Sequence, residues 1–530
     1  MSEFSLRVPP MTTRAGNGMV CAIDHLAAQA GVSMLRAGGS AADAAVATSA
    51  VLAVTSPHVC GMGGDLLAVY CPADATPLAL NASGRAGSGA DADRLRSEGH
   101  RTMPFRGDIR SVTVPGCVDG WLALHGRFGR LPLRDVLEPA RQYAEEGFAA
   151  SPTLAWSIRY VSALEEAADL TTHATARPGM MLRRPGVARA LADIAQSGRD
   201  GFYRGEFGDG LIALGAGEFE VSDLRDDGAR WSPAVKVSAW GHDLWTVGPN
   251  SQGYLTLASS FIAAGLDLPE DPHDPKWAHL LIEASRQAAF DRVNVLFDGA
   301  DPAVLLNENE LLARRSHIDP ERAGSMTGSF TNGDTIALCA VDAERNGVSL
   351  IQSNASGFGS MLIVPGVRIF LHNRGMGFSL EPGHPAQYGP GRRPPHTLSP
   401  LAVTTFGGAL RAVAGTMGGD AQPQILLQIL ARFLVGHESP GDAVAAGRFA
   451  LSGGATGFDT WNAGGDELTV EIEGHAPAAW DAALTSLGHR TQRTEPFSSG
   501  FGHAHLISVE EDHLAGGSDP RSFFGAAAGI

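Results

Sequence analysis

The 530-residue sequence has few cysteines and no recognisable metal motif. Its five cysteines are scattered, odd in number and without C-x-x-C spacing: Cys21, Cys60, Cys71, Cys117 and Cys339. They are expected to be reduced, mostly buried thiols, which excludes a disulfide framework and a thiolate metal site. The 18 histidines include no H-E-x-x-H sequence, so no metal or other cofactor is expected.

Positive charge and long apolar segments are also scarce. A formal net charge of -17 argues against a nucleic-acid partner, because binding to the phosphate backbone needs a positive surface. No run of about 18 uncharged apolar residues occurs, so no membrane span is expected. The start of the chain, MSEFSLRVPPMTTRAGNG, contains no apolar core of the kind that a signal peptide needs. The sequence therefore predicts a cytoplasmic protein.

What is present is typical of a globular protein with many turns: 44% hydrophobic residues, 66 glycines and 31 prolines. Residues 24–37 predict a helix that stops at Gly38 and Gly39. Ser40, with Asp43 three residues later, predicts a capping box at the start of a second helix. That helix, AADAAVATSAVLAV, is made of small and apolar residues and is expected to be buried on most sides.

The middle of the chain is predicted to be helical. Residues 276–298 carry apolar residues at spacings of three and four and predict the longest amphipathic helix of the chain. Residues 303–334 are expected to be irregular and end in SMTGSFTNGD, which is typical of an exposed linker.

The pattern changes to strands after this linker. Residues 335–341 and 348–353 predict a hairpin joined by DAERNG. Further strands are expected in VRIFLHN, LAVTTFGG and LRAVAG, followed by the helix QPQILLQILARFLV and a final strand pair near 469–473 and 504–509. Strands paired by hairpins, with helices at both ends of the chain, predict a layered α+β architecture in which helices cover sheets.

The junction of linker and strand, Asp334-Thr335, allows two interpretations. A threonine at a strand start is ordinary, because β-propensity alone places it there. If the bond before Thr335 is cut, however, one residue carries a hydroxyl and a free α-amine. That amine, with an ordinary pKa of about 7.7–8.0, is able to act as general base for its own hydroxyl.

Other candidate residues lie in short polar or glycine-rich segments, each with a plain structural alternative. The segment from Gly415 to Asp420 is either a strand-to-helix turn or, through the N–H groups of Gly418 and Gly419, an oxyanion site. Arg85 is either a surface arginine or a carboxylate clamp. His396 and Thr397, with Ser399, either line a pocket or form a proline-stiffened turn.

Two further motifs are excluded or weakened. The turn CGMGGD before a predicted strand at residue 65 lacks the Lys-Ser/Thr of a phosphate-binding loop and reverses the order of strand and helix, so nucleotide binding is disfavoured. No G-x-S-x-G sequence occurs at a strand-to-helix turn, so a serine nucleophile elbow is not indicated.

A series of segments over nearly the whole chain resembles the γ-glutamyltransferase family. In the order of that family they are AAQAGVSMLRAGGSAADAAVA, GMGGD, SGRAG, VPGCVDGW, FGRLPLRDVLEPARQYAEEGF, GFYRGEFGDGLI, VSDL, EASRQAAFDR, GDTIALCAVD, SGFGS, PPHTLSP and GTMGGD. The resemblance implies a four-layer αββα sandwich of the N-terminal nucleophile hydrolase type. It also implies cleavage between Asp334 and Thr335 into subunits of residues 1–334 and 335–530.

The resemblance assigns roles to individual residues. Thr335 is the implied nucleophile and base, and Ser353 stands where the family usually has a threonine that hydrogen-bonds the nucleophile. Gly418 and Gly419 match the oxyanion pair, and Arg85 matches the arginine that holds a substrate carboxylate. The implied partners are a small amide substrate and the chain's own second fragment, with a dimer of this heterodimer left open.

Departures from the family pattern concern the substrate pocket. Ala355, Arg374 and Gly377 stand where the γ-glutamyl enzymes carry Asn, Gln and Asp, which disfavours recognition of a free amino-acid head group. His396 and Thr397 replace a serine pair, and this PPHT version is similar to the branch that includes oxamate amidohydrolase. The sequence thus predicts an amidohydrolase for a small, carboxylate-bearing, oxamate-like amide held by Arg85, Arg374, His396 and Thr397.

Three alternatives stay open at the level of sequence. One is a γ-glutamyltransferase or glutathione hydrolase that binds the ammonium group with other residues. Another is a β-lactam side-chain acylase. The third, from a different class, is an uncleaved relative without catalytic activity.

Overall fold

Two seven-stranded antiparallel sheets form the centre of the molecule. We describe a computed structural model, in which residues 11–173, 175–324, 335–452 and 468–530 are placed. The first sheet has the order β1 (Thr13–Ala15), β20 (Leu514–Ser518), β19 (Ala504–Val509), β15 (Leu410–Thr416), β14 (Leu401–Thr405), β9 (His242–Thr246) and β8 (Val235–Ala239). The second has the order β21 (Ala526–Gly529), β2 (Met19–Ala22), β10 (Ile336–Val341), β11 (Gly347–Ser353), β3 (Asp65–Cys71), β4 (Leu78–Ala82) and β7 (Arg230–Pro233).

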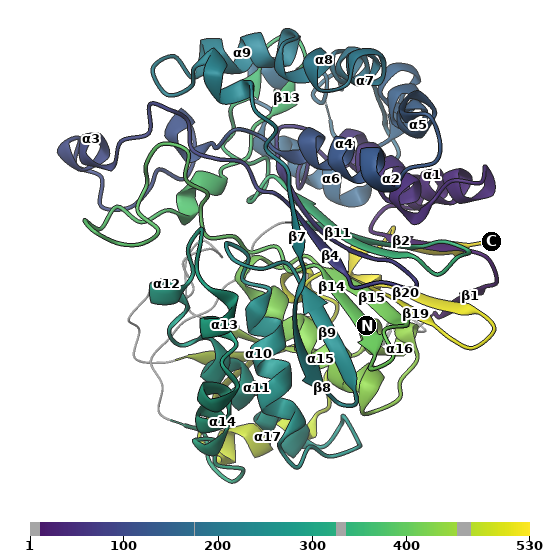
Figure 1. Ribbon diagram of the computed structural model, residues 1–530, viewed down its shortest axis with the longest axis vertical. Helices are drawn as coiled ribbons and strands as arrows, with labels where there is room; N and C mark the ends of the chain where they lie inside the picture. The colour runs from purple at the N-terminus through teal and green to yellow at the C-terminus, as the bar shows by residue number, and fades with distance from the viewer. Residues whose placement is uncertain (1–10, 174, 325–334, 453–467) are drawn as a thin grey trace.

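The two sheets pack face to face, and helices cover both outer faces (Figure 1). The contact between the sheets is a buried apolar layer with members from both, including Leu67, Cys339, Ile351, Val413 and Ile507. Strands such as β3, β10 and β11 are buried along their whole length, since one face meets the other sheet and the opposite face meets helices. The predicted layered α+β architecture, an αββα sandwich, is confirmed.

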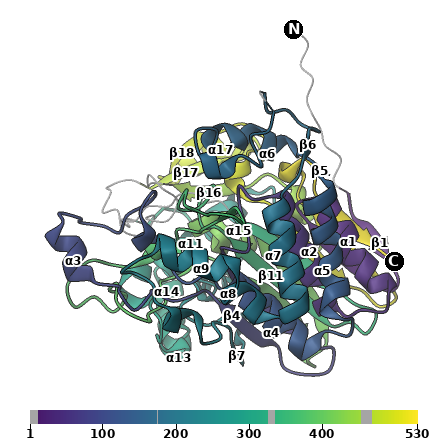
Figure 2. The ribbon, with the colours of Figure 1, turned by 90° about the horizontal axis from the view of Figure 1, so that it is seen from above.

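The helices on the second sheet come from the first half of the chain. They are α1 (His25–Arg36), α2 (Ala41–Thr55), α4 (Cys117–Phe128), α5 (Leu133–Glu146), α6 (Pro152–Ser157), α7 (Pro185–Ser197), α8 (Arg199–Tyr203) and α9 (Glu206–Leu214). Figure 2 shows α1, α2, α5 and α7 side by side above this sheet. α2 begins with the predicted capping box of Ser40 and Asp43, and every one of its residues is buried.

Helices α10 (Tyr254–Ala264), α15 (Gln422–Leu434) and α16 (Pro440–Ala445) cover the first sheet. Behind them lie α11 (Pro275–Ala289), α14 (Glu308–Ser316) and α17 (Ala479–Ser486). The short elements are α3 (Ala92–Ser97), α12 (Arg292–Val295), α13 (Pro302–Leu305) and the strands β5 (Phe148–Ala149), β6 (Met181–Leu182), β12 (Ile363–Val364), β13 (Ile369–Phe370), β16 (Phe449–Ser452), β17 (Thr469–Ile472) and β18 (Arg490–Arg493).

Two predictions for the middle of the chain are wrong. The helix expected over 276–298 is interrupted, since α11 ends at Ala289 and α12 begins at Arg292; α11 is buried on all sides from Trp277 onward. In the turn between them, the carboxylate of Asp291 accepts a bond of 2.8 Å from Arg314 of α14. The stretch from residue 303, expected to be irregular, contains α14, which Asn307 caps by accepting from the N–H of Glu310.

The predicted strand pair near 469–473 and 504–509 is also wrong. Both strands exist as β17 and β19, but β17 joins β16 and β18 in a separate three-stranded sheet. β19 lies instead between β15 and β20 of the first large sheet.

The hairpin predicted after residue 335 is confirmed as β10 and β11. All five cysteines are free and buried, as expected.

Candidate active site

The hydroxyl groups of Thr335 and Ser353 lie 3.1 Å apart at one end of the second sheet. Thr335 directly precedes β10, and Ser353 is the last residue of β11. Because the two strands form an antiparallel hairpin, the start of one meets the end of the other. The Ser353 Oγ also accepts a bond of 2.8 Å from the amide of Ala355. Ser353 thus accepts one bond in addition to its contact with Thr335, in which either hydroxyl is able to donate.

Thr335 lines a cavity of about 770 Å³ with a largely apolar wall. Its lining includes aromatic side chains from distant parts of the chain: Trp156, Tyr160, Phe358, Phe523 and Phe524. Met417, the residue before the glycine pair, lines the same cavity. The structure therefore places the start of β10 and the end of β15 at the same cavity.

Gly418 and Gly419 form the turn between β15 and α15. Both have positive φ, +138° and +53°, conformations that glycine adopts without a Cβ clash. Among the hydrogen bonds between described residues, none is donated by the amide of either glycine. Two such amides at a helix start can receive a developing oxyanion.

The glycine turn is tied to the loop that carries Thr397. The Gln252 side-chain amide donates to the carbonyl of Gly419 and to that of Thr397, each at 3.0 Å. Two segments that the sequence singled out separately are thus held together by one buried side chain.

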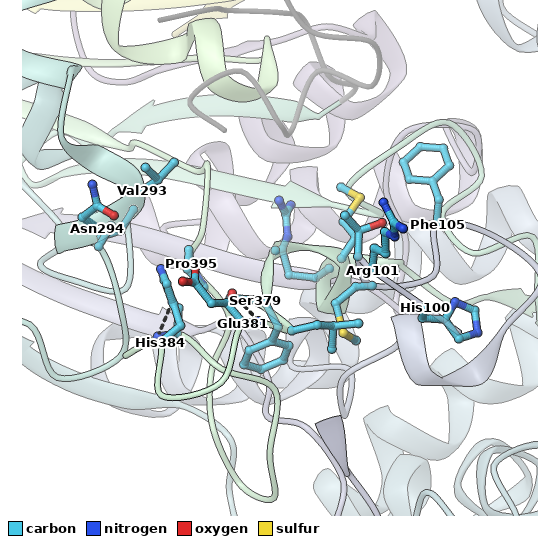
Figure 3. Close-up of a pocket in the computed structure, with 18 of the residues that line it drawn as sticks. His100, Arg101, Phe105, Val293, Asn294, Ser379, Glu381, His384 and Pro395 are labelled. Carbon is cyan, nitrogen blue, oxygen red and sulfur yellow. Dashed lines mark hydrogen bonds between the residues drawn. The ribbon is translucent and has the colours of Figure 1, made fainter. Parts of the chain in front are cut away.

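A second cavity, of about 710 Å³, has several basic side chains in its lining and is named the cationic cavity for them (Figure 3). Four arginines and two histidines line it, with one acidic side chain, Glu381: Arg96, Arg101, Arg292, Arg374, His100 and His384. Three of the arginines pair with carboxylates of the fold, Arg96 with Asp93, Arg292 with Asp420 and Arg374 with Asp65. The lining therefore offers guanidinium donors with a small net charge. Two of the predicted substrate-binding residues, Arg374 and Thr397, face this cavity.

A buried carboxylate, Asp65, lies in contact with Arg374, His396 and His372. Its Oδ2 accepts from Nε of Arg374 at 2.7 Å, and Nε2 of His396 and Nδ1 of His372 lie 3.0 and 3.3 Å away. Burial raises the pKa of Asp65, but the arginine and the two histidines outweigh it and hold that pKa well below its usual range. Burial, then the Arg374 charge, lowers the pKa of His396 to about 4. At neutral pH the site therefore contains a carboxylate, a guanidinium and a neutral imidazole.

Asp65 also connects this cluster to the Thr335 hydroxyl. It is the cross-strand partner of Ser353 in the pairing of β3 with β11. Arg374 extends the chain of contacts by donating from Nη1 to Oγ1 of Thr397 at 3.0 Å. The sequence analysis treated Asp65 only as the end of a glycine turn. Its partners lie about 300 residues away in the chain, so spacing within the motif could not reveal its role.

Two other residues missed at the level of sequence are His58 and His503, which line the Thr335 cavity. Burial, then the neighbouring His503, lowers the pKa of His58 to about 3. Burial is also the main cause that lowers the pKa of His503 to about 4. Both imidazoles are neutral at pH 7, which leaves Arg106 as the charged side chain among the described residues that line this cavity.

Arg85 is not brought to this site. It lines neither of the two large cavities, and its carbonyl accepts a backbone bond from Val114. Burial, then the charge of Arg230, lowers the pKa of its half-buried guanidinium. Asp334, the other residue of the expected cleavage point, lies outside the described residues. Ala355 and Gly377, at the altered family positions, lie on the hairpin end and in the cationic cavity.

The described residues contain one group that could hold a metal: His279, Glu283 and His489, all buried. Protein partners occupy these groups. Nδ1 of His279 and Nε2 of His489 share a hydrogen bond of 2.8 Å, and Glu283 accepts from Arg286 at 2.7 Å. The group lines neither large cavity. None of the helices in the described ranges is long and apolar enough to span a bilayer.

Comparisons with known proteins agree with this geometry. The chain is 34% identical to an oxamate amidohydrolase proenzyme of Klebsiella pneumoniae, covering 97% of this chain and 98% of that protein. It is 33% identical to the glutathione hydrolase-like YwrD proenzyme of Bacillus subtilis, with the same coverage. A cephalosporin acylase structure from Bacillus halodurans superposes with a TM-score of 0.88 at 30% identity, covering 100% of this chain and 99% of that one.

The family model for gamma-glutamyltranspeptidase matches residues 27–529. Together with the αββα sandwich, these matches give the N-terminal nucleophile hydrolase fold and a hydrolase of C–N amide bonds. The resemblance seen in the sequence is confirmed. The chain belongs to the gamma-glutamyltranspeptidase family.

Proposed function

We propose that the protein is an autoprocessing amidohydrolase that hydrolyses a small, carboxylate-bearing amide through an acyl-enzyme on Thr335. The observation that carries the proposal is the contact between the Thr335 and Ser353 hydroxyls beside a cavity. A threonine hydroxyl at the start of a strand acts as a nucleophile only when an activating group and an oxyanion-binding site lie nearby.

The first step is cleavage of the Asp334–Thr335 bond, which gives subunits of residues 1–334 and 335–530. Sheet topology supports a stable heterodimer, because β10 of the second subunit pairs on one side with β2 of the first subunit and on the other with β11 of its own. β11 in turn pairs with β3 of the first subunit along its whole length. Cutting one bond outside these strands leaves the interleaved sheets intact.

Hydrolysis then uses the α-amine and the hydroxyl of Thr335, together with groups of neighbouring residues. The free α-amine of Thr335 takes the proton of its hydroxyl, whose oxygen attacks the amide carbon. Ser353 orients the hydroxyl, and the amides of Gly418 and Gly419 stabilise the oxyanion. The C–N bond breaks, the amine leaves with the proton, and water releases the acid from Thr335.

The cationic cavity supports a substrate carboxylate. Arg374 and Thr397 are the proposed contacts, with His396 positioning Arg374 through Asp65. Arg85 lines neither cavity and lies near Arg230 and Arg393, so we assign it a structural role there. The oxamate amidohydrolase relative makes oxamate the first substrate to test.

Hydrolysis or transfer of γ-glutamyl groups is the second candidate, favoured by the glutathione hydrolase-like relative. Against it, Glu381 is the single acidic side chain in the lining of the cationic cavity, so an α-ammonium group has few partners there. The predicted cytoplasmic location stays a prediction, to be tested by cell fractionation.

The deciding experiment is intact mass measurement of the denatured protein with N-terminal sequencing. We expect two fragments from the 55.2 kDa chain, the smaller beginning Thr-Ile-Ala-Leu, and an uncut Thr335→Ala variant. A wild-type chain that stays uncut on incubation overturns the proposal in favour of a relative without catalytic activity. Efficient turnover of γ-glutamyl-p-nitroanilide and glutathione without turnover of oxamate would overturn the assigned specificity alone.

A further inference from the structure

The cavity beside Thr335 is larger and more aromatic than a small amide requires. Its volume of about 770 Å³ falls within the roughly 300–1,000 Å³ of sites that enclose drug-sized ligands. A carboxylate-bearing amide of a few heavy atoms would leave most of this space filled with water.

Aromatic rings at this cavity are unusually exposed. Trp156, Tyr160 and Phe523 are 56%, 54% and 71% exposed, and all three line the cavity. The Trp156 and Tyr160 rings meet edge to face at 5.3 Å, and the Arg159 guanidinium lies 3.8 Å from the Trp156 ring centre. Large apolar side chains held in water around a hollow are typical of ligand-binding surfaces.

The two large cavities differ in their linings, and of the two, Thr335 lines the aromatic one. Thr335 is related to the other through Ser353, whose cross-strand partner Asp65 accepts a hydrogen bond from Arg374, a residue of the cationic cavity. The buried histidines of the aromatic wall, His58 and His503, have lowered pKa values and are neutral at pH 7. The charged side chain among its described lining residues is Arg106, which donates to the carbonyl of Gly357 at 2.9 Å.

An amide held at Thr335 also has two sides, the acyl group and the amine. A carboxylate on the acyl side matches the cationic cavity, which leaves the amine side at the aromatic one. We infer that the amine half of the substrate carries an aromatic or similarly bulky apolar group, which binds against Trp156, Tyr160 and Phe523. This inference rests on the proposed function, since it needs Thr335 as the attacking group.

The chemistry balances without a further reactant. The Thr335 oxygen forms an ester bond as the amide C–N bond breaks, and the substituted amine departs with the proton taken from the hydroxyl. Water then cleaves the ester and releases the carboxylate-bearing acid. The aromatic group stays on the amine throughout, so it contributes binding and no new chemical step.

The test uses N-methyloxamate and N-benzyloxamate, which share one acyl group and differ in the amine. With the cleaved wild-type enzyme, kcat/KM is expected to be about tenfold or more higher for the benzyl amide, from burial of a ring. Trp156→Ala and, separately, Phe523→Ala should lower the benzyl-to-methyl ratio toward one. The matched control is Phe406→Ala, because Phe406 is similarly exposed, at 67%, and lines neither cavity.

Each variant is first checked for self-cleavage by mass. Hydrolysis of N-methyloxamate with no preference for the benzyl amide, in a fully cleaved enzyme, overturns the inference and leaves the proposed function standing. A wild-type ratio that the Trp156 and Phe523 variants do not lower also overturns it. If the cleaved enzyme hydrolyses neither amide nor oxamate, the proposed oxamate-like specificity fails, and the inference fails with it.

Discussion

Asp65 and Arg374 form a buried ion pair, with 2.7 Å between Oδ2 of the aspartate and Nε of the arginine. Both side chains are at most 2% exposed. The arginine that replaces an amide at this family position therefore has its own counter-ion within the fold, while its Nη1 reaches Thr397 at the cationic cavity. Arg374 thus belongs both to the buried core and to the wall of the cationic cavity.

Asp65→Asn should destabilise the protein strongly. Removal of the carboxylate charge leaves the Arg374 guanidinium buried without its counter-ion, which typically costs about 3–5 kcal/mol. Urea unfolding measures the change, on a Thr335→Ala background so that every variant is one uncut chain. Adding Arg374→Met to Asp65→Asn should recover part of the loss, because no buried charge is then left over. Strictly additive effects of the two substitutions would contradict the pairing.

Ser353→Ala should slow turnover without abolishing it. The lost hydrogen bond to Thr335, about 1–2 kcal/mol, corresponds to roughly five- to thirtyfold in kcat, with KM little changed. Ser353→Thr is the matched control, since it keeps the hydroxyl and should retain activity. Steady-state kinetics on the cleaved enzyme gives both values. Equal losses in the two variants would mean that packing at Ser353, and not its hydroxyl, matters.

Local signals in the sequence were sufficient where a structure depends on neighbouring residues. The capping box of Ser40 and Asp43, the buried α2 and the hairpin of β10 and β11 all follow from short-range chemistry and were predicted. The start of α14 at Asn307 carried a similar signal, an N-cap followed by Glu308 and Glu310, and could have been recognised.

Tertiary contacts decide the features that were missed. The partners of β17 and β19 depend on which sheet each strand joins. Asp65 was missed for the same reason, because it meets Arg374 and His396 only in the fold. The family resemblance supplied Thr335, Ser353 and the glycine pair, and it also supplied Arg85, which lines neither of the two large cavities.

Stability should increase with pH between about 4 and 6.5 because of buried neutral histidines. His503 has its pKa lowered to about 4, against about 6.5 in an unfolded chain. Between these values the unfolded state binds the extra proton, so unfolding becomes easier as pH falls, by up to about 1.4 kcal/mol per pH unit for such a residue. Its contribution is fully present above pH 6.5 and is lost progressively toward pH 4.

His503→Gln tests this linkage. The slope of unfolding free energy against pH should decrease between pH 4 and 6.5, whereas above pH 7 only a pH-independent difference from the lost Ser499 contact should remain. Chemical denaturation at a series of pH values measures both regions. An unchanged slope would show that His503 is not the neutral, buried group that the structure places beside Thr335.

Gly418→Ala should remove most activity. At φ +138° an added Cβ strains the backbone whatever the space around it, so the turn shifts and with it the amides of Gly418 and Gly419. The added Cβ would also lie 2.9 Å from Cδ1 of Ile425, the flexible end of that side chain. Loss of one oxyanion donor typically lowers kcat by about 10²–10³-fold. Gly408→Ala is the control, because Gly408 has φ +87° but no atom within 4 Å of the added Cβ. Both variants should show a fall in Tm from backbone strain of about 1–3 kcal/mol, somewhat larger in Gly418→Ala because of the contact with Ile425. Only Gly418→Ala should lose turnover, and equal activity in the two would exclude this turn as the oxyanion site.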